Sequence, residues 1–417
     1  MSKLWRPFSV PGSRSSIEVA TGNAAHIGST DGRKYIDATS GLWNVSLGYG
    51  HPELIGEMRK QLERLSFSAL FDSTHSPAEV LSERLVKLTN DRMQYVYLST
   101  SGSSAVEVAL RVARLHFRAL GKNAKRKIIS FDLGYHGCTA ISGAASGVLT
   151  SELLRSGELL PDFINVASPV DEVASLAHIE RLFKEDGQSI AALVVEPILG
   201  SGGIIVPTVG YWKEINRLCE RHDVLLVADE VATGGGRCGA MFASDVLGLA
   251  PDMITLSKGI NSGYFPVGVT MFSERVVRPI TTAGMVFQYG STQDGNPVGC
   301  ASALATLDIV HGPGFFERVN QVGGFIRERI LSSAAGTVVS QVRGLGLMIG
   351  VELAHLDAAR SPFSDRESYL VRQACMDAGL LVYHFSSGIS LFPPLIVSDE
   401  EAEDIADIVA EVVRGFI

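Results

Sequence analysis

Short apolar runs alternate with amphipathic helical stretches along most of the chain, and this alternation restricts the fold more than any other feature. It is the pattern of an α/β domain with a mainly parallel sheet, because strands that are apolar on both sides must be covered by helices on both faces. The predicted strands are residues 95–98, 127–131, 191–196, 224–229, 253–257 and 267–272. We therefore expect a large α/β domain.

The two ends of the chain differ from its middle. Residues 1–55 contain hairpin-like turns near residues 22 and 30–33, and residues 311–417 return to mixed strand and helix. A chain of 417 residues is long for one hydrophobic core and short for three. The simplest expectation is a large domain over residues 56–310, with a small α+β domain that residues 1–55 and 311–417 build together.

Composition excludes several classes of protein. Thirty-six basic and 45 acidic residues give a net charge of −9, which disfavours a nonspecific nucleic-acid binder. The five cysteines are widely separated and form no Cys-x-x-Cys pair, so neither a disulfide framework nor a structural metal site is expected. The first residues lack the apolar core of a signal peptide. We expect a cytoplasmic protein that binds no membrane and no metal.

One candidate ligand site is the turn Ser-Thr-Ser-Gly-Ser-Ser-Ala-Val-Glu at residues 99–107. A strand is predicted to end at Leu98, and a helix to run over residues 105–120 with a capping box between Ser104 and Glu107. The unpaired amides of the first turn would then lie near Gly102 and Ser103, where the helix dipole favours a phosphate. An ordinary strand-to-helix turn would look the same.

Two charged residues end neighbouring apolar strands. Asp229 follows an apolar run at the carboxyl edge of the predicted sheet, where open α/β sheets bind their ligands. Lys258 ends the next apolar strand, and a partly desolvated lysine has a lowered pKa and attacks carbonyl groups. Each alone could be a capping or surface residue. Together with the phosphate turn they specify pyridoxal 5′-phosphate, whose aldehyde needs an amine and whose ring nitrogen needs a carboxylate.

The sequence resembles the class III pyridoxal-phosphate-dependent aminotransferases of fold type I over nearly its whole length. The matching segments are GYGHP at 48–52, SGSSAVE at 101–107, YHG at 135–137, EP at 196–197, DEV at 229–231, TGGGR at 233–237, SKG at 257–259 and STQDGNP at 291–297. Jointly these motifs are specific, although each alone is weak. The resemblance implies the two-domain fold of that family.

The resemblance also implies roles around the cofactor ring. Lys258 would bind the cofactor aldehyde covalently, and Asp229 would pair with the ring nitrogen. Tyr135 would stack on one face of the ring and Val231 would pack against the other. Glu196 would support the pocket through hydrogen bonds.

Further roles concern the phosphate and the assembly. Gly102 and Ser103 would hold the phosphate, and Thr292 would reach the phosphate of a neighbouring subunit, so the family's site is completed only in a homodimer. His136 belongs to the cofactor pocket as a structural residue, because the lysine itself can serve as the base.

Two departures from the family pattern concern the substrate. Ser201 stands where ornithine- and aminobutyrate-type members have a glutamate. Residues 381–392, just before Pro393, contain no arginine, although amine–pyruvate transaminases and diaminopelargonate synthases place one there, and His384 is the only basic group of that segment. Bidentate recognition of a substrate carboxylate by that route is therefore in doubt.

What remains for the substrate is mostly apolar. Leu42 and Trp43 occupy the segment that lines the substrate side in amine transaminases, and Phe8 resembles an N-terminal aromatic residue of diaminopelargonate synthase. Each of these side chains could equally belong to a core.

These residues favour an aminotransferase that moves an amino group between a primary amine or ω-amino compound and a keto acid or aldehyde. A diaminopelargonate synthase-type aminotransferase is the nearest alternative. An aminomutase, racemase or decarboxylase on the same fold is also open, because the cofactor residues are shared. A non-catalytic protein is disfavoured by the presence of both Lys258 and Asp229.

Overall fold

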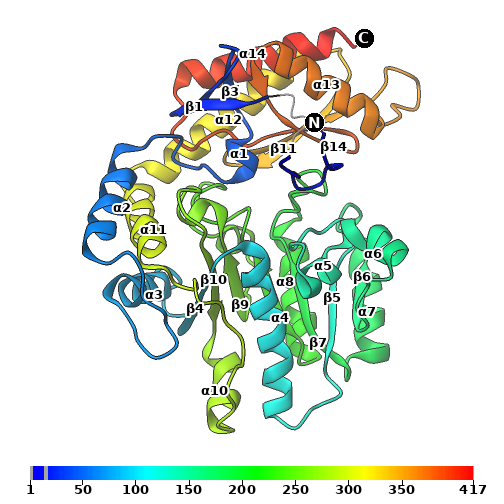
Figure 1. Ribbon diagram of the computed structural model, residues 1–417. Helices are drawn as coiled ribbons and strands as arrows, with labels where there is room; N and C mark the ends of the chain where they lie inside the picture. Colours follow the sequence, from blue (N-terminus) through cyan, green and yellow to red (C-terminus); the bar gives the residue numbers. More distant parts are fainter. Residues whose placement is uncertain (1–2, 14–16, 417) are drawn as a thin grey trace.

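The computed structural model describes residues 3–13 and 17–416, and its centre is a seven-stranded sheet (Figure 1). The strand order is β4-β10-β9-β8-β7-β5-β6. The strands are β4 (Tyr95–Ser99), β5 (Lys127–Phe131), β6 (Phe163–Val166), β7 (Ile190–Val195), β8 (Leu225–Asp229), β9 (Met253–Leu256) and β10 (Gly268–Phe272). Only β10 runs antiparallel to its neighbours, so the predicted mainly parallel sheet is confirmed.

All six predicted strands are present, whereas β6 was not predicted. Its sequence carries Asn165 in the middle of a short run, and the amide donates to Ser130 Oγ at 2.9 Å and accepts from Thr150 Oγ1 at 2.6 Å. Because neighbouring side chains form hydrogen bonds with Asn165, this strand can contain a polar residue, and a search for apolar runs does not detect it.

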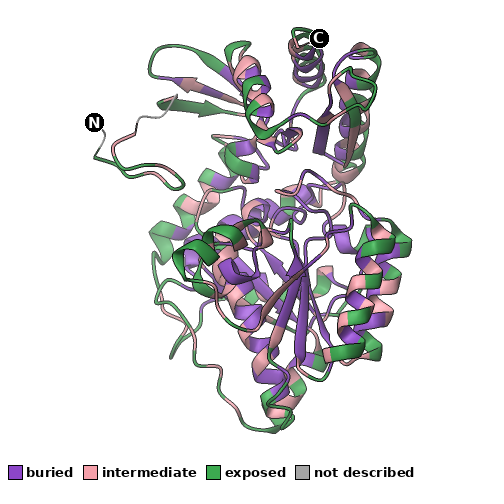
Figure 2. Cartoon of the chain, turned by 90° about the vertical axis from the view of Figure 1, so that its right-hand side faces the viewer, coloured by how far each residue is buried: buried purple, intermediate pink, exposed green. Residues whose placement is uncertain are grey.

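Helices cover both faces of the large sheet. One face packs against α4 (Gly102–Ala119), α5 (Ala140–Ala145) and α10 (Glu274–Thr282), and the other against α7 (Glu172–Asp186) and α8 (Val209–Arg221). Within β7, Ala192 and Val194 face the first group, while Leu193 and Val195 face the second. Figure 2 shows the resulting buried strands beneath helices that are exposed on their outer sides.

A second layer of helices lies beside β4 and β10. It consists of α2 (Pro52–Arg64), α3 (Ser76–Leu88) and α11 (Pro297–Val310), which share an apolar core with these strands (Figure 1). Other short helical segments of the chain are α6 (Thr150–Ser156), α9 (Ala243–Leu247) and the 3-10 turns at Gly147–Leu149 and Lys258–Ile260.

The two ends of the chain meet in a separate apolar core. One small sheet has the order β1-β2-β3-β13, with strands Val19–Asn23, His26–Ser29, Lys34–Asp37 and Leu380–Leu381. The other has the order β11-β12-β15-β14, with strands Val339–Leu345, Met348–Leu353, Gly388–Leu391 and Tyr383–Phe385. Helices α12 (Phe315–Ser333), α13 (Asp365–Asp377) and α14 (Asp399–Arg414) pack with them. The domain boundaries at residues 55 and 310 stay a prediction.

The start of α4 differs from the sequence prediction. The helix begins at Gly102, three residues early, and its N-cap is Ser101, which exchanges capping hydrogen bonds with Ser104. The predicted box between Ser104 and Glu107 is wrong, because Glu107 instead accepts the Thr139 hydroxyl proton at 2.6 Å.

No helix within residues 3–13 and 17–416 is both long and apolar enough to cross a lipid bilayer.

Candidate active site

A cavity lies where the carboxyl ends of β8 and β9 meet the start of α4. Its lining residues are Trp43, Ser101, Gly102, Ser103, Tyr135, His136, Gly137, Glu196, Asp229, Val231, Ala232, Ser257 and Lys258. Because β8 and β9 run parallel with Asp229 opposite Thr255, the acid and Lys258 reach the same edge of the sheet. The structure thus brings together nine of the residues predicted for the site.

Three predicted residues do not line this cavity. Thr292 lies on an exposed segment after α10, the Leu42 side chain is 59% exposed, and Phe8 is 82% exposed. Their assignments stay predictions.

Lys258 presents its amine inside the cavity. It follows β9 with a φ of 43°, and its Nζ lies 4.9 Å from the centroid of the Trp43 ring. Burial lowers the pKa of the Lys258 ammonium, while the carboxylates of Asp229 and Glu196 offset part of that effect. A larger fraction of this amine is therefore neutral and nucleophilic than in an exposed lysine at the same pH.

Asp229 is a buried carboxylate held by three donors. Its Oδ1 accepts the Thr255 hydroxyl at 3.0 Å and the Val231 N–H at 3.1 Å, and its Oδ2 lies 2.8 Å from His136 Nδ1. The support from His136 and Thr255 was not predicted. One feature of the sequence could have indicated this support: Thr255 is a polar residue within the otherwise apolar strand β9, so its hydroxyl needs a partner inside the protein.

Glu196 and Tyr135 shape another wall. The Glu196 carboxylate is 4% exposed and accepts the N–H groups of Tyr135 and Gly200, each at 3.0 Å. Burial raises the pKa of Glu196. Burial, helped by Cys138, also raises the pKa of Tyr135 to about 12, so its phenol stays protonated near neutral pH. Glu196 therefore fixes the backbone that carries Tyr135.

The first turn of α4 forms a tight backbone cradle. The N–H groups at the start of a helix have no partner within it, and Ser101 Oγ caps the N–H of Ser104 at 3.1 Å. A Cβ on Gly102 would approach Val231 Cγ1 to 2.9 Å, and one on Gly137, whose φ is 120°, would approach Ser103 Oγ to 2.5 Å. Side chains are thus excluded where these two glycines border the cavity.

Trp43 closes the cavity from the opposite side. The segment α1 (Ser40–Trp43) is one left-handed turn, with φ values of 47°, 56°, 72° and 65°. Each non-glycine residue in that conformation costs about 1–2 kcal/mol. The indole stacks on Phe392 with ring centroids 4.4 Å apart and is 6% exposed.

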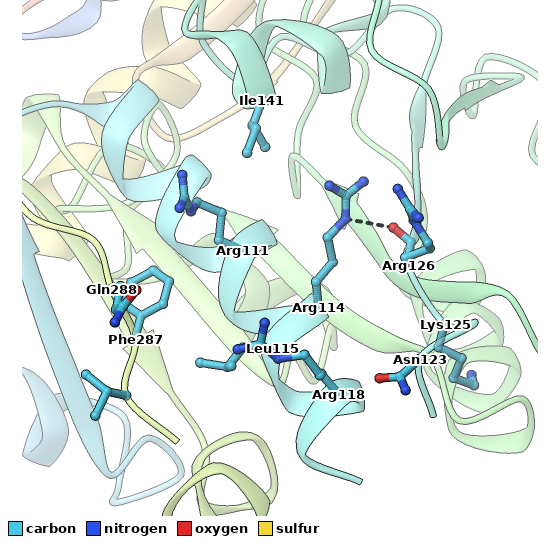
Figure 3. Close-up of a pocket in the computed structure, with 11 residues that line it drawn as sticks. Arg111, Arg114, Leu115, Arg118, Asn123, Lys125, Arg126, Ile141, Phe287 and Gln288 are labelled. Carbon is cyan, nitrogen blue, oxygen red and sulfur yellow. Dashed lines mark hydrogen bonds between the residues drawn. The ribbon is translucent and has the colours of Figure 1, made fainter. Parts of the chain in front are cut away.

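A groove of about 860 Å³ beside α4 gathers positive charge (Figure 3) and shares no lining residue with this cavity. Its cationic lining residues are Arg111, Arg114, Arg118, Lys125 and Arg126. Most are engaged within the chain: the Lys125 ammonium donates to three main-chain carbonyls, and Arg126 pairs with Asp162 at 2.7 Å. Arg114 donates its Nε–H to the Arg126 carbonyl at 2.8 Å. No residue predicted for the cofactor or substrate lines this groove.

Comparison with known proteins decides the family. The family model "Aminotransferase class-III" matches residues 9–413, almost the whole chain. The chain belongs to the class III aminotransferases.

Relatives of this class III aminotransferase match it end to end. It is 31% identical to an adenosylmethionine-8-amino-7-oxononanoate aminotransferase of Anoxybacillus flavithermus, over 98% of this chain and 94% of that protein. It is 30% identical to a putrescine–pyruvate aminotransferase of Pseudomonas aeruginosa, over 93% of this chain and 88% of that protein. The resemblance stated from the sequence is confirmed.

A solved structure agrees in fold. An amine transaminase from an uncultivated Pseudomonas species, solved with pyridoxal phosphate bound, superposes with a TM-score of 0.92 at 32% identity, covering 99% of this chain and 98% of that one. The predicted fold type and cofactor are therefore confirmed, and this class III aminotransferase is a pyridoxal-phosphate-dependent transaminase.

Proposed function

We propose that the strand-edge cavity is the active site and that it transfers an amino group from a primary amine or ω-amino compound to a keto acid or aldehyde. The observation that carries this proposal is the convergence of the Lys258 amine, the buried Asp229 carboxylate and the first turn of α4 on one cavity. The cofactor has a matching group for each of them: its aldehyde for the amine, its ring nitrogen for the carboxylate and its phosphate for the start of α4.

The residues present fit pyridoxal phosphate. Gly102 and Ser103 would hold the phosphate on the α4 cradle, where the neighbouring glycines leave no room for a side chain. Asp229 would hold the ring nitrogen, with Tyr135 and Val231 against the ring. Glu196 and His136 would support the cofactor indirectly, Glu196 by accepting the backbone N–H of Tyr135 and His136 by its hydrogen bond with the Asp229 carboxylate.

The bound cofactor supplies an aldehyde carbon that accepts the amino group and a ring that withdraws electrons from the substrate carbon. Lys258, once its amine is free and neutral, would take the proton from the substrate carbon and deliver it to the aldehyde carbon of the cofactor. Burial favours the neutral amine that this transfer needs. Asp229 would pair with the ring nitrogen through a carboxylate that the Thr255 hydroxyl, the Val231 N–H and His136 hold in place.

The lining of the cavity favours donors without a carboxylate close to the amine. Among the described lining residues, Lys258 is the only lysine or arginine. Nearby arginines are occupied: Arg237 donates to the carbonyls of Leu347 and Pro393, and Arg343 to the carbonyl of Gly203. An apolar indole, instead, faces the amine of Lys258.

The proposal is tested by half-reactions with single amines. Formation of pyridoxamine phosphate should accompany release of the matching carbonyl product, without carbon dioxide. Carbon dioxide release would indicate a decarboxylase, and a rearranged or racemised donor would indicate a mutase or racemase. The diaminopelargonate synthase alternative, supported by the Anoxybacillus relative, predicts that adenosylmethionine is the preferred donor and 8-amino-7-oxononanoate the preferred acceptor.

We further propose a cytoplasmic homodimer with shared sites, in which Thr292 of one subunit contacts the phosphate held by Ser103 of the other. Thr292 supports this because it is exposed and lies outside the cavity of its own chain. A groove beside this segment has a mixed polar and apolar lining that includes Phe71 and Val286, which are 64% and 74% exposed. Solvent-facing apolar side chains at one surface favour a contact with a second copy.

The shared site is tested by complementation. Lys258→Ala chains should be inactive, and Thr292→Ala should weaken cofactor binding by about 1–3 kcal/mol, the cost of a lost hydrogen bond to a charged group. A hybrid dimer carries one site with both changes and one with neither, so mixed chains should exceed both parents in activity. An active monomer in sedimentation, or no complementation, contradicts the proposal.

A further inference from the structure

Asp37 is a buried carboxylate whose bonded partners are all uncharged. It ends β3, is 1% exposed, and accepts hydrogen bonds only from backbone N–H and hydroxyl donors of the described chain. Burying a carboxylate is costly unless its oxygens are satisfied. A buried carboxylate that is stabilised only by neutral hydrogen-bond donors is expected to fix the backbone segments that carry those donors.

The donors to Asp37 surround the entry to the left-handed turn. Its Oδ1 accepts the Thr39 N–H at 2.9 Å and the Thr39 hydroxyl at 2.5 Å. Its Oδ2 accepts the Gly41 N–H at 2.8 Å and the Tyr49 hydroxyl at 2.7 Å. Thr39 and Gly41 flank Ser40, the first residue of the turn with positive φ. The carboxylate therefore bridges the point at which the backbone enters a conformation that L-residues disfavour.

The far end of the same turn is Trp43. Ser40 Oγ donates to the carbonyl of Phe392 at 2.5 Å, and the Trp43 indole stacks on the Phe392 ring. A Cβ on Gly200 would approach the indole to 2.7 Å, so the ring is also closely confined on that side. The position of the indole over Lys258 thus depends on backbone torsions that Asp37 stabilises.

We propose that Asp37 is a positioning residue: it fixes Trp43 over Lys258 and thereby limits the size of the side group that an amine donor can carry. This inference rests on the proposed function, in which Trp43 borders the substrate. Asp37 touches neither the cavity nor the reacting groups, and its effect passes through the turn alone.

The test compares Asp37→Asn with Tyr49→Phe. Asparagine places an NH₂ group where Asp37 accepts two donors, and phenylalanine removes one donor while keeping the ring. Asp31→Asn is the matched control, because Asp31 accepts local hydrogen bonds in an exposed turn of the same sheet. Each variant is assayed for kcat/KM with a small amine, 2-aminobutane, and a bulky one, 1-phenylethylamine.

The expected result is a ratio of small-amine to bulky-amine kcat/KM that falls about tenfold in Asp37→Asn, the usual scale of discrimination by a hydrophobic pocket. Tyr49→Phe should shift the ratio in the same direction by less, and Asp31→Asn should leave it unchanged. The ratio does not depend on the fraction of folded enzyme, so a merely destabilised variant would not move it. In a Trp43→Gly background, Asp37→Asn should change the ratio no further.

A second readout needs no substrate. In a Trp5→Phe background, fluorescence comes from Trp43 and from Trp212, which is 0% exposed. Asp37→Asn should increase acrylamide quenching, because a released indole becomes accessible. Unchanged quenching together with an unchanged ratio in both variants would overturn the proposal, and Tyr49→Phe carries the test if Asp37→Asn does not fold. If the unmodified enzyme converts neither amine, the donor class of the proposed function excludes these two amines, while quenching still tests Asp37.

Discussion

Replacing Asp229 by asparagine separates charge from shape at the centre of the site. The asparagine carbonyl can still accept from Thr255 and Val231, but its NH₂ group then faces His136 Nδ1, 2.8 Å from the present Oδ2. Two donors would oppose each other unless the imidazole proton moves to Nε2. That nitrogen is buried and has no partner among the described residues. The substitution therefore leaves one buried donor unsatisfied.

Two magnitudes follow for Asp229→Asn. One unsatisfied buried donor lowers the free energy of unfolding by about 1–3 kcal/mol. The loss of negative charge at the ring nitrogen should slow the half-reaction by about two to four orders of magnitude, which corresponds to about 2.7–5.4 kcal/mol of activation free energy. The rate effect should exceed the stability effect.

The assay follows single-turnover formation of pyridoxamine phosphate at saturating amine, with urea unfolding of the same preparations. Asp252→Asn is the control, because Asp252 also sits beside the large sheet, accepts the Leu226 N–H at 2.9 Å and pairs with Arg275. It should lose stability without slowing the half-reaction. A near-normal rate in Asp229→Asn with full cofactor content would refute the reasoning, because another group would then have to protonate the ring nitrogen.

Three further predictions concern the other site residues. Lys258→Ala should still bind the cofactor noncovalently but turn over negligibly, whereas Lys60→Ala, at an exposed pair with Glu57, should keep full activity; normal turnover in the first variant would exclude the assigned base. Because burial lowers the pKa of Lys258, the unfolded chain binds more protons between that lowered pKa and the ordinary value of 10.5, so apoenzyme stability should rise with pH in that window. Lys258→Met should abolish this slope in pH-dependent urea unfolding, and an identical slope in both proteins would contradict the shift. Tyr135→Phe should keep most of the activity because it keeps the ring that would stack on the cofactor, while Tyr135→Ala should lose stacking and raise the Kd for the cofactor; equal losses in both variants would mean that the hydroxyl is what matters.

The parts of the fold and site that follow local rules could be predicted. The six apolar strands were found because both faces of each are covered by apolar side chains. Asp229 and Lys258 were found because a charged side chain at the end of such a strand needs a partner or a ligand. The motifs that resemble the family added Tyr135 and Glu196, and the cavity contains both.

The parts that depend on distant partners could not be predicted. His136 supports Asp229 from 93 residues away, and no local pattern marks that pairing. The left-handed turn before Trp43 contains one glycine only, so nothing in the sequence Ser-Gly-Leu-Trp signals four positive φ values. Their stabilisation by Asp37, Tyr49 and Phe392 appears only once the chain has folded.

The pairing of the two chain ends sets the order in which the enzyme can be assembled during synthesis. Asp37 lies beside Leu381 in the β3–β13 pair, and Ser40 reaches the Phe392 carbonyl across 352 residues of sequence. The large sheet with Asp229 and Lys258 is complete on the ribosome well before those partners emerge, since domains fold as the chain is made. The wall formed by Trp43 is therefore the last part of the site to close. A nascent chain would present an open cofactor edge from the synthesis of β10 until Phe392 emerges, and the loss of a C-terminal stretch that includes Phe392 would leave that edge open permanently.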